Sequence, residues 1–403
     1  MGAAPVLAVF KALGAPKTDV RFVGGCVRDA VLSRTIKDID VATPDEPAVV
    51  IEKLDGAGLK AVPTGLAHGT VTAVAGGQPF EITSLRKDTA CDGRHAAVEF
   101  TTDWVEDASR RDFTFNALSL RQDGELFDPF GGVEDAKAGR VRFVGDPRDR
   151  IQEDYLRILR YFRFIALYGT EAPDADILAA CRTLRHGLAE LSTERVRDEF
   201  IKLLNARDPD AALAAMADTG VLSEVFPEAR SRELLRLLVI VERDFDVTPG
   251  DKTWRQRWVA MFDHAAPSVA RRMRLAGKDV KSIEALGGAA LAAAAAFEPI
   301  PRNRFLHAFA DAANPDCPAP GAVLIACARE NGETTSRWSD LMAHARSWHV
   351  RHFPLGGADV HRLGIEDGPR TGALLRAVEQ EWVDGGFVLT AADLRARLES
   401  LAR

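Results

Sequence analysis

The pattern of apolar and polar positions changes once along this chain. Up to about residue 145 the apolar runs are short and strand-like, and turn-forming residues separate them. The segments predicted as strands are 20–24, 36–42, 59–63, 70–76, 79–85, 115–120 and 141–145. Helical periodicity between them predicts helices over 4–13, 27–34 and 46–57. This mixture of strands and helices predicts an α+β head.

From residue 146 onward the pattern is helical almost throughout. Apolar residues recur at helical spacing, and prolines interrupt them at intervals from Pro173 to Pro354. The predicted fold is therefore an α+β head with a mixed sheet, followed by an all-helical remainder. The predicted parts are a head (1–145), a neck (146–206), a body (207–310) and a tail (311–403).

Composition narrows the class of protein only slightly. A chain of 403 residues is long enough for two or more domains, and 46% hydrophobic with 28% charged residues is ordinary for a soluble protein. The net charge of -7 means that any nucleic-acid surface must be a local basic region. No apolar run reaches the ~18 residues that span a bilayer, so no membrane partner is expected. The five scattered cysteines predict free thiols and a cytoplasmic location.

Two aspartates one residue apart, Asp38 and Asp40, stand in the predicted strand 36–42. Side chains alternate between the faces of a strand, so both carboxylates would project from one face. Two such carboxylates repel each other unless a cation lies between them. Mg2+ is commonly held by one or two carboxylates and by phosphate oxygens of a substrate. Taken alone, however, the D-x-D pattern is more often a feature of a solvated edge strand.

Gly24, Gly25 and Arg28 stand just before the aspartates and strengthen the chemical interpretation. Glycines let a backbone approach phosphates closely, and an arginine can hold a triphosphate. Neither the G-x-x-x-x-G-K-[ST] of P-loops nor the G-x-G-x-x-G of dinucleotide folds occurs in the chain. The segment therefore predicts a metal-dependent phosphoryl-transfer site of another type.

Glu81 lies in the predicted strand 79–85 and is a candidate third carboxylate beside the two aspartates. A solvated charge on an edge strand is an equally good interpretation. The polar, turn-rich segment 89–98 that follows is predicted to be a mobile loop over the site. Farther along, Arg111 and Asp112 precede an apolar segment. By themselves they are best explained as a surface ion pair, which is nearly neutral in energy.

The segment 153–164 carries charged residues at three-residue spacing: Asp154, Arg157, Arg160 and Arg163. On one helix these four would lie along a drifting face. A carboxylate beside a guanidinium offers both an acceptor and a donor to the edge of a base. The alternative is an ordinary intrahelical ion pair, which contributes only about 0.2 to 0.5 kcal/mol.

These motifs resemble the nucleotidyltransferase superfamily that includes DNA polymerase beta. Within it, the sequence is similar to the class II tRNA CCA-adding enzymes and the bacterial poly(A) polymerases. The resemblance covers most of the chain and is strongest from residue 20 to 164. Its motifs are 24–29 with 38–40, 110–118, 128–139, 153–164 and 191–206. The segment 352–387 resembles the tail signature of CCA-adding enzymes, in which a helical domain receives the elbow and T-loop of tRNA.

The resemblance implies untemplated addition of C, C and A to the 3' end of tRNA, from CTP and ATP, with Mg2+. Asp38 and Asp40 would hold the metal, with Glu81 as a third catalytic carboxylate. Gly24, Gly25 and Arg28 would contact the triphosphate, and Arg111 and Asp112 the sugar and phosphates. Asp154 and Arg157 would pair with the base, with Arg160 and Arg163 as secondary contacts.

Alternatives remain open at this stage. A bacterial poly(A) polymerase shares every head motif, and an enzyme that adds only CC or only A would look the same. A non-catalytic RNA-binding homologue is a further alternative, against which both aspartates argue. Basic clusters at 255–257 and 271–274 are candidates to line the RNA path, although such clusters are more often solvated surface. The sequence does not indicate an oligomeric state.

Overall fold

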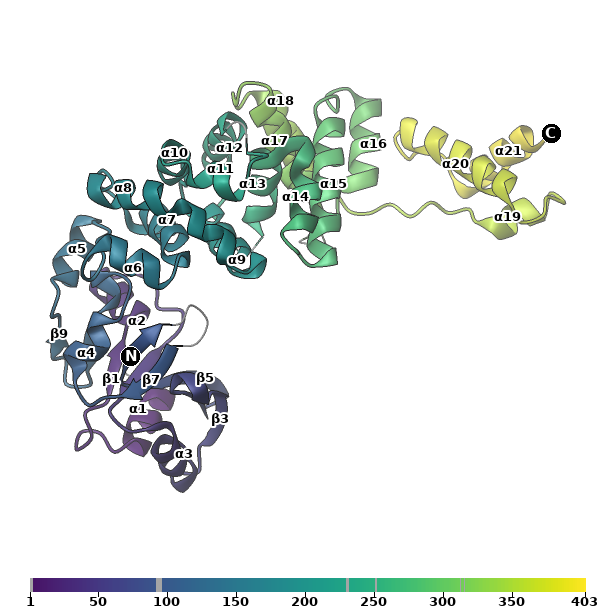
Figure 1. Ribbon diagram of the computed structural model, residues 1–403. Helices are drawn as coiled ribbons and strands as arrows, with labels where there is room; N and C mark the ends of the chain where they lie inside the picture. The colour runs from purple at the N-terminus through teal and green to yellow at the C-terminus, as the bar shows by residue number, and fades with distance from the viewer. Residues whose placement is uncertain (1–2, 92–95, 230–231, 251, 312, 315) are drawn as a thin grey trace. The chain divides into compact units, whose positions relative to one another are not determined.

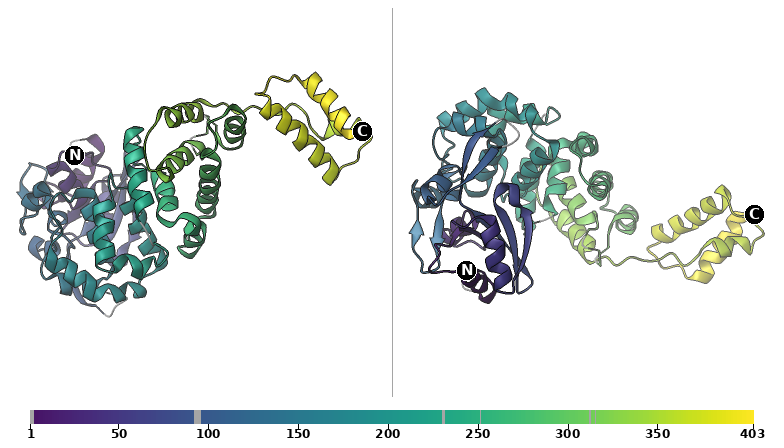
Figure 2. Two further views of the ribbon diagram at one scale, coloured as in Figure 1. Left: turned by 90° about the horizontal axis from the view of Figure 1, so that it is seen from above. Right: turned by 60° about the horizontal axis from the view of Figure 1, so that its bottom comes forward.

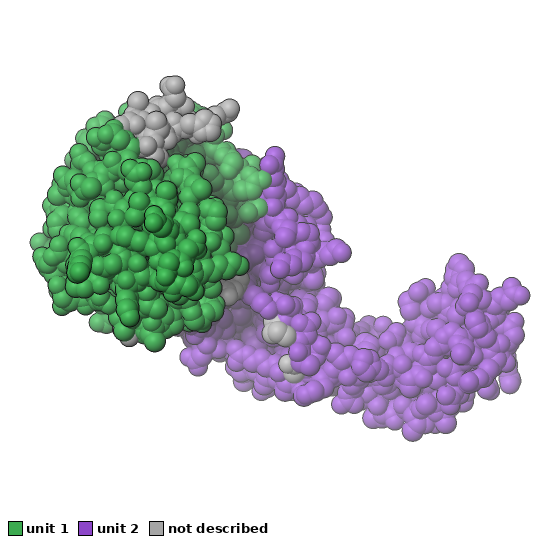
Figure 3. Space-filling model, turned by 90° about the horizontal axis from the view of Figure 1, so that it is seen from below, with its two compact units in different colours: residues 1–226 green, residues 227–403 purple. Residues whose placement is uncertain are grey.

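The computed structural model describes residues 3–91, 96–229, 232–250, 252–311, 313–314 and 316–403, and for 88–91 and 96–98 the backbone alone. These residues form two compact units, Met1–Phe226 and Pro227–Arg403 (Figure 3). The division into head, neck, body and tail is finer than these two units, and its internal boundaries remain predictions.

A seven-stranded mixed sheet forms the centre of the first unit (Figure 1). Its strands are β1 (Arg21–Val23), β2 (Asp40–Thr43), β3 (Lys60–Gly65), β4 (Thr70–Ala75), β5 (Gln78–Ser84), β8 (Ser119–Arg121) and β9 (Leu126–Phe127). Their order across the sheet is β3-β4-β5-β2-β1-β8-β9. Only β2 and β5 run parallel, whereas the other neighbouring pairs are antiparallel.

Helices of the first unit cover one face of this sheet and continue beyond it. They are α1 (Ala4–Ala12), α2 (Gly25–Val31), α3 (Pro47–Gly56), α4 (Trp104–Ser109), α5 (Gly132–Ala138), α6 (Pro147–Glu153), α7 (Leu156–Tyr168), α8 (Ala175–Leu184), α9 (Thr193–Leu204), α10 (Asp210–Asp218) and α11 (Val221–Val225). Apolar residues of α1 and α3 share one buried core with Val41 and Ile82 of the central strands. Figure 2 shows the helices near the N-terminus beside the strands. Because side chains alternate along a strand, Asp40 and Glu81 face away from this core.

The aspartate strand is shorter than predicted. The structure starts β2 at Asp40, not at residue 36, so Asp38 lies in the irregular segment before the strand. The register pairs Asp40 with Glu81, which would place Pro79 opposite Asp38. A proline has no N–H to donate to the ladder, so pairing ends there. The alternation argument for the two aspartates therefore fails, although they remain neighbours.

Three other segments differ from their predictions. Residues 141–145 contribute only an isolated bridge, in which Phe143 pairs with Phe113. A single pair of residues is too short to form a strand. The segment predicted as a strand over 115–120 starts in a 3₁₀ turn, Thr114–Asn116, which buries Phe115.

The segment predicted as a mobile loop, 89–98, is largely a hairpin instead. β6 (Arg86–Cys91) pairs antiparallel with β7 (Ala96–Phe100) as a separate two-stranded sheet. The tip of the predicted loop, 92–95, lies outside the described residues.

The second unit contains no strand among its described residues, in agreement with the predicted helical remainder. Its helices are α12 (Glu233–Asp244), α13 (Thr253–Phe262), α14 (Ala266–Arg272), α15 (Gly277–Ala293), α16 (Pro299–Phe309), α17 (Ala319–Arg329), α18 (Ser336–Ser347), α19 (Gly357–His361), α20 (Pro369–Asp384) and α21 (Ala391–Ala402). An irregular connection, 348–356, precedes α19 (Figure 1). Nowhere in the described part of the chain is a helix both long and apolar enough to cross a membrane.

Candidate functional site

A pocket of about 570 Å³ in the first unit gathers most of the residues singled out from the sequence. It is lined by Gly24, Gly25, Arg28, Asp40, Arg86, Arg110, Arg111, Asp112, Asn116, Asp154, Leu156, Arg157, Arg160, Arg163, Phe164 and Arg195. Ten of the twelve predicted site residues are among them. The other two, Asp38 and Glu81, are exposed and do not line the pocket.

The charge of this pocket is strongly positive. Eight of its lining residues are arginines, and only three are aspartates. Several arginines around one cavity concentrate positive potential there, and their guanidinium groups are matched to phosphate oxygens. The pocket is therefore suited to a ligand with several negative charges.

Gly24 allows the close approach of two chain segments at the pocket wall. Its backbone has φ +68°, a region that favours glycine, and it directly precedes helix α2. A Cβ atom at this position would lie 3.2 Å from Nη1 of Arg111. A side chain here would therefore strain the backbone and crowd an arginine of the site.

Arg28 is buried and held by several groups in a single orientation. It donates hydrogen bonds to Oδ1 of Asn116 at 2.7 Å and to Oδ1 of Asp29 at 3.0 Å. Its guanidinium carbon lies 4.4 Å from the ring centroid of Tyr168. Tyr168 also donates its hydroxyl to Asp29 at 3.0 Å. Because Tyr168 ends α7, these contacts connect α2 to the helix that carries Arg157 and Arg160.

Three carboxylates interact at the end of β2. Burial raises the pKa of Asp40, and the negative charges of Glu81 and Asp38 add to this increase, while Arg111 opposes it. Among the described residues, no group of three or more potential metal ligands is already assembled around one point. Two acids together with phosphate oxygens of a substrate remain a suitable donor set for a hard divalent cation.

Asp112 forms a buried ion pair with Arg160 of α7, which the sequence did not reveal. Oδ2 of Asp112 accepts from Nε of Arg160 at 2.7 Å, and Oδ1 accepts from Nδ2 of Asn116 and the backbone N–H of Phe113, both at 2.9 Å. Burial alone would raise the pKa of Asp112, but these groups outweigh it and hold the pKa below its usual value. The predicted surface pair of Arg111 with Asp112 is therefore wrong.

Arg111 pairs instead with Asp107 of α4, a residue that sequence reasoning missed. Asp107 is 2% exposed and accepts from Arg110 through Oδ1 at 2.7 Å and from Arg111 through Oδ2 at 3.1 Å. Burial would raise the pKa of Asp107, but the two guanidinium charges lower it overall. The spacing of three and four residues along the chain was the signal for these pairs.

The predicted single helix through Asp154 is broken at that residue. α6 ends at Glu153 and α7 begins at Leu156, while Asp154 has an extended backbone, φ -157° and ψ 106°. Oδ1 of Asp154 accepts the backbone N–H of Leu156 at 3.1 Å. An aspartate side chain that accepts the backbone N–H two residues ahead forms a local turn, which competes with a continuous helix.

The partner of Asp154 comes from another helix, not from Arg157. Nη2 of Arg195, in α9, donates to Oδ2 of Asp154 at 2.7 Å. Ser192 is the N-cap of α9, since its hydroxyl accepts from the backbone N–H of Arg195 at 3.4 Å. Arg195 also lines the pocket, although it was not among the residues singled out from the sequence.

Arg157 is held by the end of α6. Its Nη1 donates to Oε2 of Glu153 at 2.5 Å and to the carbonyl of Arg150 at 2.7 Å. Arg163 pairs with buried Glu199 of α9, with 3.1 Å between Nε and Oε2. Burial lowers the pKa of Arg163 to about 10. These contacts fix the arginines of α7 relative to α6 and α9.

The basic clusters of the second unit are mostly neutralised by acids. Arg257 is 1% exposed and forms a buried pair with Glu242 at 2.7 Å, so it cannot line an RNA path. Three further arginines of these clusters form ion pairs with acids: Arg255 with Asp279, Arg271 with Glu284, and Arg272 with Glu228.

Two family profiles match parts of this chain. Residues 20–142 match the "Poly A polymerase head domain", which includes the sheet and the glycine and aspartate segments. Residues 172–232 match the "Probable RNA and SrmB- binding site of polymerase A".

Relatives match over nearly the whole length. CCA tRNA nucleotidyltransferase 1, mitochondrial, of Mus musculus is 34% identical over 93% of this chain and 85% of its own. The CCA-adding enzyme of Streptococcus gordonii is 31% identical over 95% of this chain and 93% of its own. The crystal structure of the Bacillus stearothermophilus CCA-adding enzyme in complex with CTP is 27% identical, covers 98% of this chain and 96% of its own, and superposes with a TM-score of 0.79. Together with the site geometry, these matches show that the chain belongs to the class II CCA-adding enzyme family.

Proposed function

We propose that this protein adds C, C and A to the 3' end of tRNA, using CTP and ATP and releasing pyrophosphate. The observation that carries this proposal is the single pocket in which a glycine turn, Asp40 and eight arginines meet. Full-length similarity to CCA-adding enzymes supports the same reaction. The resemblance of segment 352–387 to the tail signature of this family favours tRNA over other RNAs.

The triphosphate is proposed to bind against Gly24, Gly25 and Arg28, with Arg111 beside them. Asn116, Asp29 and Tyr168 already orient Arg28, so little side-chain entropy is lost when it meets a phosphate. Asp107 holds Arg111 in the same way. Positive charge fixed before the reaction stabilises the charge that develops on the phosphates.

Asp38 and Asp40 are the proposed ligands of a divalent cation such as Mg2+, with Glu81 next to them. The raised pKa of Asp40 fits such a site, because burial, together with the charges of Glu81 and Asp38, disfavours the charged form of Asp40. When bound, the cation supplies charge neutralisation at the phosphates and favours the deprotonated 3'-hydroxyl. The 3'-hydroxyl attacks the α-phosphorus of the nucleotide. Pyrophosphate leaves toward Arg28.

Base choice is proposed to rest on Asp154 and Arg157. Asp154 offers carboxylate lone pairs that Leu156 and Arg195 do not saturate, and Arg157 keeps N–H groups beyond those bound to Glu153 and to the carbonyls of Arg150 and Arg110. An acceptor and a donor that line the same pocket can read the edges of C and A without a template strand. Asp112, which lies beside Arg111 and Arg160, is proposed to act on the sugar. Arg160 and Arg163 are proposed to border the phosphates.

Incubation of one tRNA lacking CCA with CTP, ATP or both tests the proposal. We expect two C residues with CTP alone and complete CCA with both nucleotides. Growth of an A homopolymer on an unrelated RNA would identify a poly(A) polymerase instead. Addition of only CC or only A would identify a split-activity enzyme, and no incorporation at all would favour the RNA-binding homologue.

We infer a cytoplasmic location for this chain. Cys26, Cys181, Cys317 and Cys327 are free thiols, which fits a reducing compartment. The side chain of Cys91 lies outside the described residues. Because the mouse relative is mitochondrial by its name, cell fractionation is the appropriate test.

A further inference from the structure

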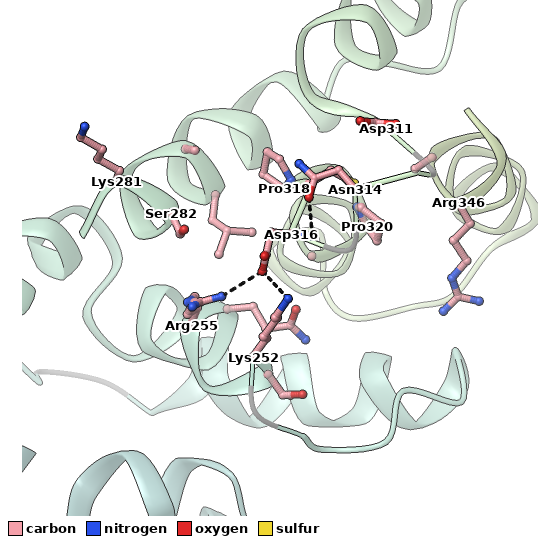
Figure 4. Close-up of a pocket in the computed structure, with 17 residues that line it drawn as sticks. Lys252, Arg255, Lys281, Ser282, Asp311, Asn314, Asp316, Pro318, Pro320 and Arg346 are labelled. Carbon is pink, nitrogen blue, oxygen red and sulfur yellow. Dashed lines mark hydrogen bonds and ion pairs between the residues drawn. The ribbon is translucent and has the colours of Figure 1, made fainter. Parts of the chain in front are cut away.

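The second unit contains a pocket of about 500 Å³ that lies outside both family profiles. Helices α13, α15, α17 and α18 and the segment before α17 form its walls (Figure 4). Its charged lining residues are Lys252, Arg255, Lys281, Arg346, Asp311 and Asp316. Four bases against two acids give it a positive balance in a chain whose net charge is -7.

Two of these bases converge on one carboxylate. Oδ1 of Asp316 lies 2.6 Å from Nζ of Lys252 and 3.4 Å from Nη1 of Arg255, as the dashed lines in Figure 4 show. Asp279 holds Arg255 through its Nε and Nη2 atoms, at 3.1 and 2.6 Å. The remaining Nη1 group of Arg255 is thereby directed at Asp316. Two cations thus define an anion position that an internal carboxylate occupies.

The carboxylate in this position can be exchanged at little cost. The side chains of Lys252 and Asp316 are 49% and 50% exposed, whereas that of Arg255 is 16% exposed. Exposed ion pairs contribute little to stability, because water solvates the separated charges well. An incoming anion would therefore meet one oriented arginine, one adaptable lysine and a weakly held competitor.

The wall beside the anion position is apolar and indicates the chemistry of the ligand. Leu286, Pro318 and Pro320 line the pocket together with the charged residues. A phosphodiester brings a sugar and a base with its charge, and these can cover apolar surface, whereas inorganic phosphate cannot. We propose that this pocket binds a phosphodiester group of the RNA substrate in place of the Asp316 carboxylate. This inference rests on the proposed function, since it takes tRNA as the partner.

The test uses the whole chain and two substitutions that are expected to change tRNA binding in opposite directions. Asp316→Asn removes the competitor, and Lys252→Gln removes one of the two cations. Glu233→Gln is the control, because it removes an acid from another exposed ion pair of this unit, with Arg236, that does not line the pocket. Binding of tRNA lacking CCA is measured by fluorescence anisotropy over a series of salt concentrations. Nucleotide incorporation at saturating tRNA is measured in parallel.

We expect Asp316→Asn to bind tRNA about threefold to tenfold more tightly and Lys252→Gln to bind it weaker by a similar factor. The slope of log affinity against log salt should become shallower by about one in Lys252→Gln, since one phosphate contact is lost. Incorporation at saturating tRNA should match that of the unmodified protein in all variants. If the unmodified protein incorporates no nucleotide, the proposed function fails, whatever the binding data show.

Two outcomes would overturn the inference while leaving the proposed function intact. One is unchanged tRNA affinity in both variants. The other is weaker binding in Asp316→Asn as well as in Lys252→Gln, which would mean that the ion pair only supports the fold. A third arm uses inorganic phosphate at constant ionic strength. If phosphate raises the melting temperature of the unmodified protein but not of Lys252→Gln, and tRNA affinity is the same in both, the pocket binds a free anion and the RNA assignment is wrong.

Discussion

The two pockets described above, one in each unit, are built from the same kinds of side chain and differ in burial. In the first unit Asp112 is 9% exposed and accepts from Arg160, Asn116 and a backbone N–H. In the second unit Asp316 is half exposed, and its nearer partner Lys252 is exposed as well, whereas Arg255 is more buried. A buried pair positions the groups around it, because breaking it leaves an uncompensated charge. An exposed pair can exchange one anion for another.

The largest expected effect tests whether the buried pocket carries the chemistry. Asp40→Ala should lower nucleotide incorporation about a thousandfold or more, because the proposed metal position loses a ligand. Binding of tRNA should stay within a few-fold. Primer-extension and anisotropy assays measure the two quantities, with Asp55→Ala, an exposed change on α3, as the control. Unchanged incorporation would remove the metal assignment, and lost binding would mean that Asp40 serves the fold.

The next effect measures the buried ion pair itself. Asp112→Asn should lower the free energy of unfolding by about 2 to 3 kcal/mol, because Arg160 loses its nearest carboxylate and keeps only the more distant Glu199, at 3.9 Å. Urea unfolding followed by far-ultraviolet circular dichroism gives the value. A change below about 0.5 kcal/mol would mean that this pair contributes no more to stability than an exposed pair does. The two pockets would then not differ in this respect.

A smaller effect concerns the residue that holds Asp154. Arg195→Gln should reduce the discrimination between CTP and ATP about tenfold, because Asp154 loses its charged partner and its fixed orientation. Single-nucleotide kcat/KM values on tRNA ending before the first C and before A give the ratio. Arg197→Gln is the control, since Arg197 pairs with Asp198 and does not line the pocket. Equal ratios in both variants would leave Arg195 without a role in base choice.

The buried acids also predict a dependence of stability on pH. Asp107 has a pKa below its unfolded value of about 3.9, so its ion pairs with Arg110 and Arg111 stabilise the fold fully above about pH 5. That contribution is lost as the pH falls below about 4, because the unfolded chain then binds more protons. Unfolding midpoints from pH 7 to pH 3 should fall more steeply for the unmodified protein than for Asp107→Asn. If the unfolding midpoints of the two proteins fall equally with pH, Asp107 does not contribute to the pH dependence of stability.

The smallest expected effect concerns the exposed ion pair in the pocket of the second unit. Asp316→Asn should leave the free energy of unfolding nearly unchanged, because the Asp316 carboxylate and its partner Lys252 are both solvent-exposed. The same urea experiment applies, and Glu233→Gln should behave alike. A loss comparable to that of Asp112→Asn would show that the second pocket is also part of the scaffold.

Much of the site could be predicted from the sequence because the chemistry is concentrated in short segments. Gly24, Gly25 and Arg28 are adjacent in the chain, and Glu81 was predicted on the strand that pairs with Asp40. The prediction of the local backbone conformation was wrong at Asp38 and at Asp154. Pro79 on a neighbouring strand ends the ladder before Asp38, and the carboxylate of Asp154 turns back to the backbone N–H of Leu156.

By itself the sequence determined the α+β head, the helical remainder and the residue types that a phosphate-handling site needs, because periodicity and motif spacing are local properties. Only the tertiary structure decided the partners of those residues. Asp112 pairs with Arg160, Arg111 with Asp107 and Asp154 with Arg195. Two of these pairs join residues more than forty positions apart, and an ion pair depends on distance in space, which the order of residues along the chain does not specify.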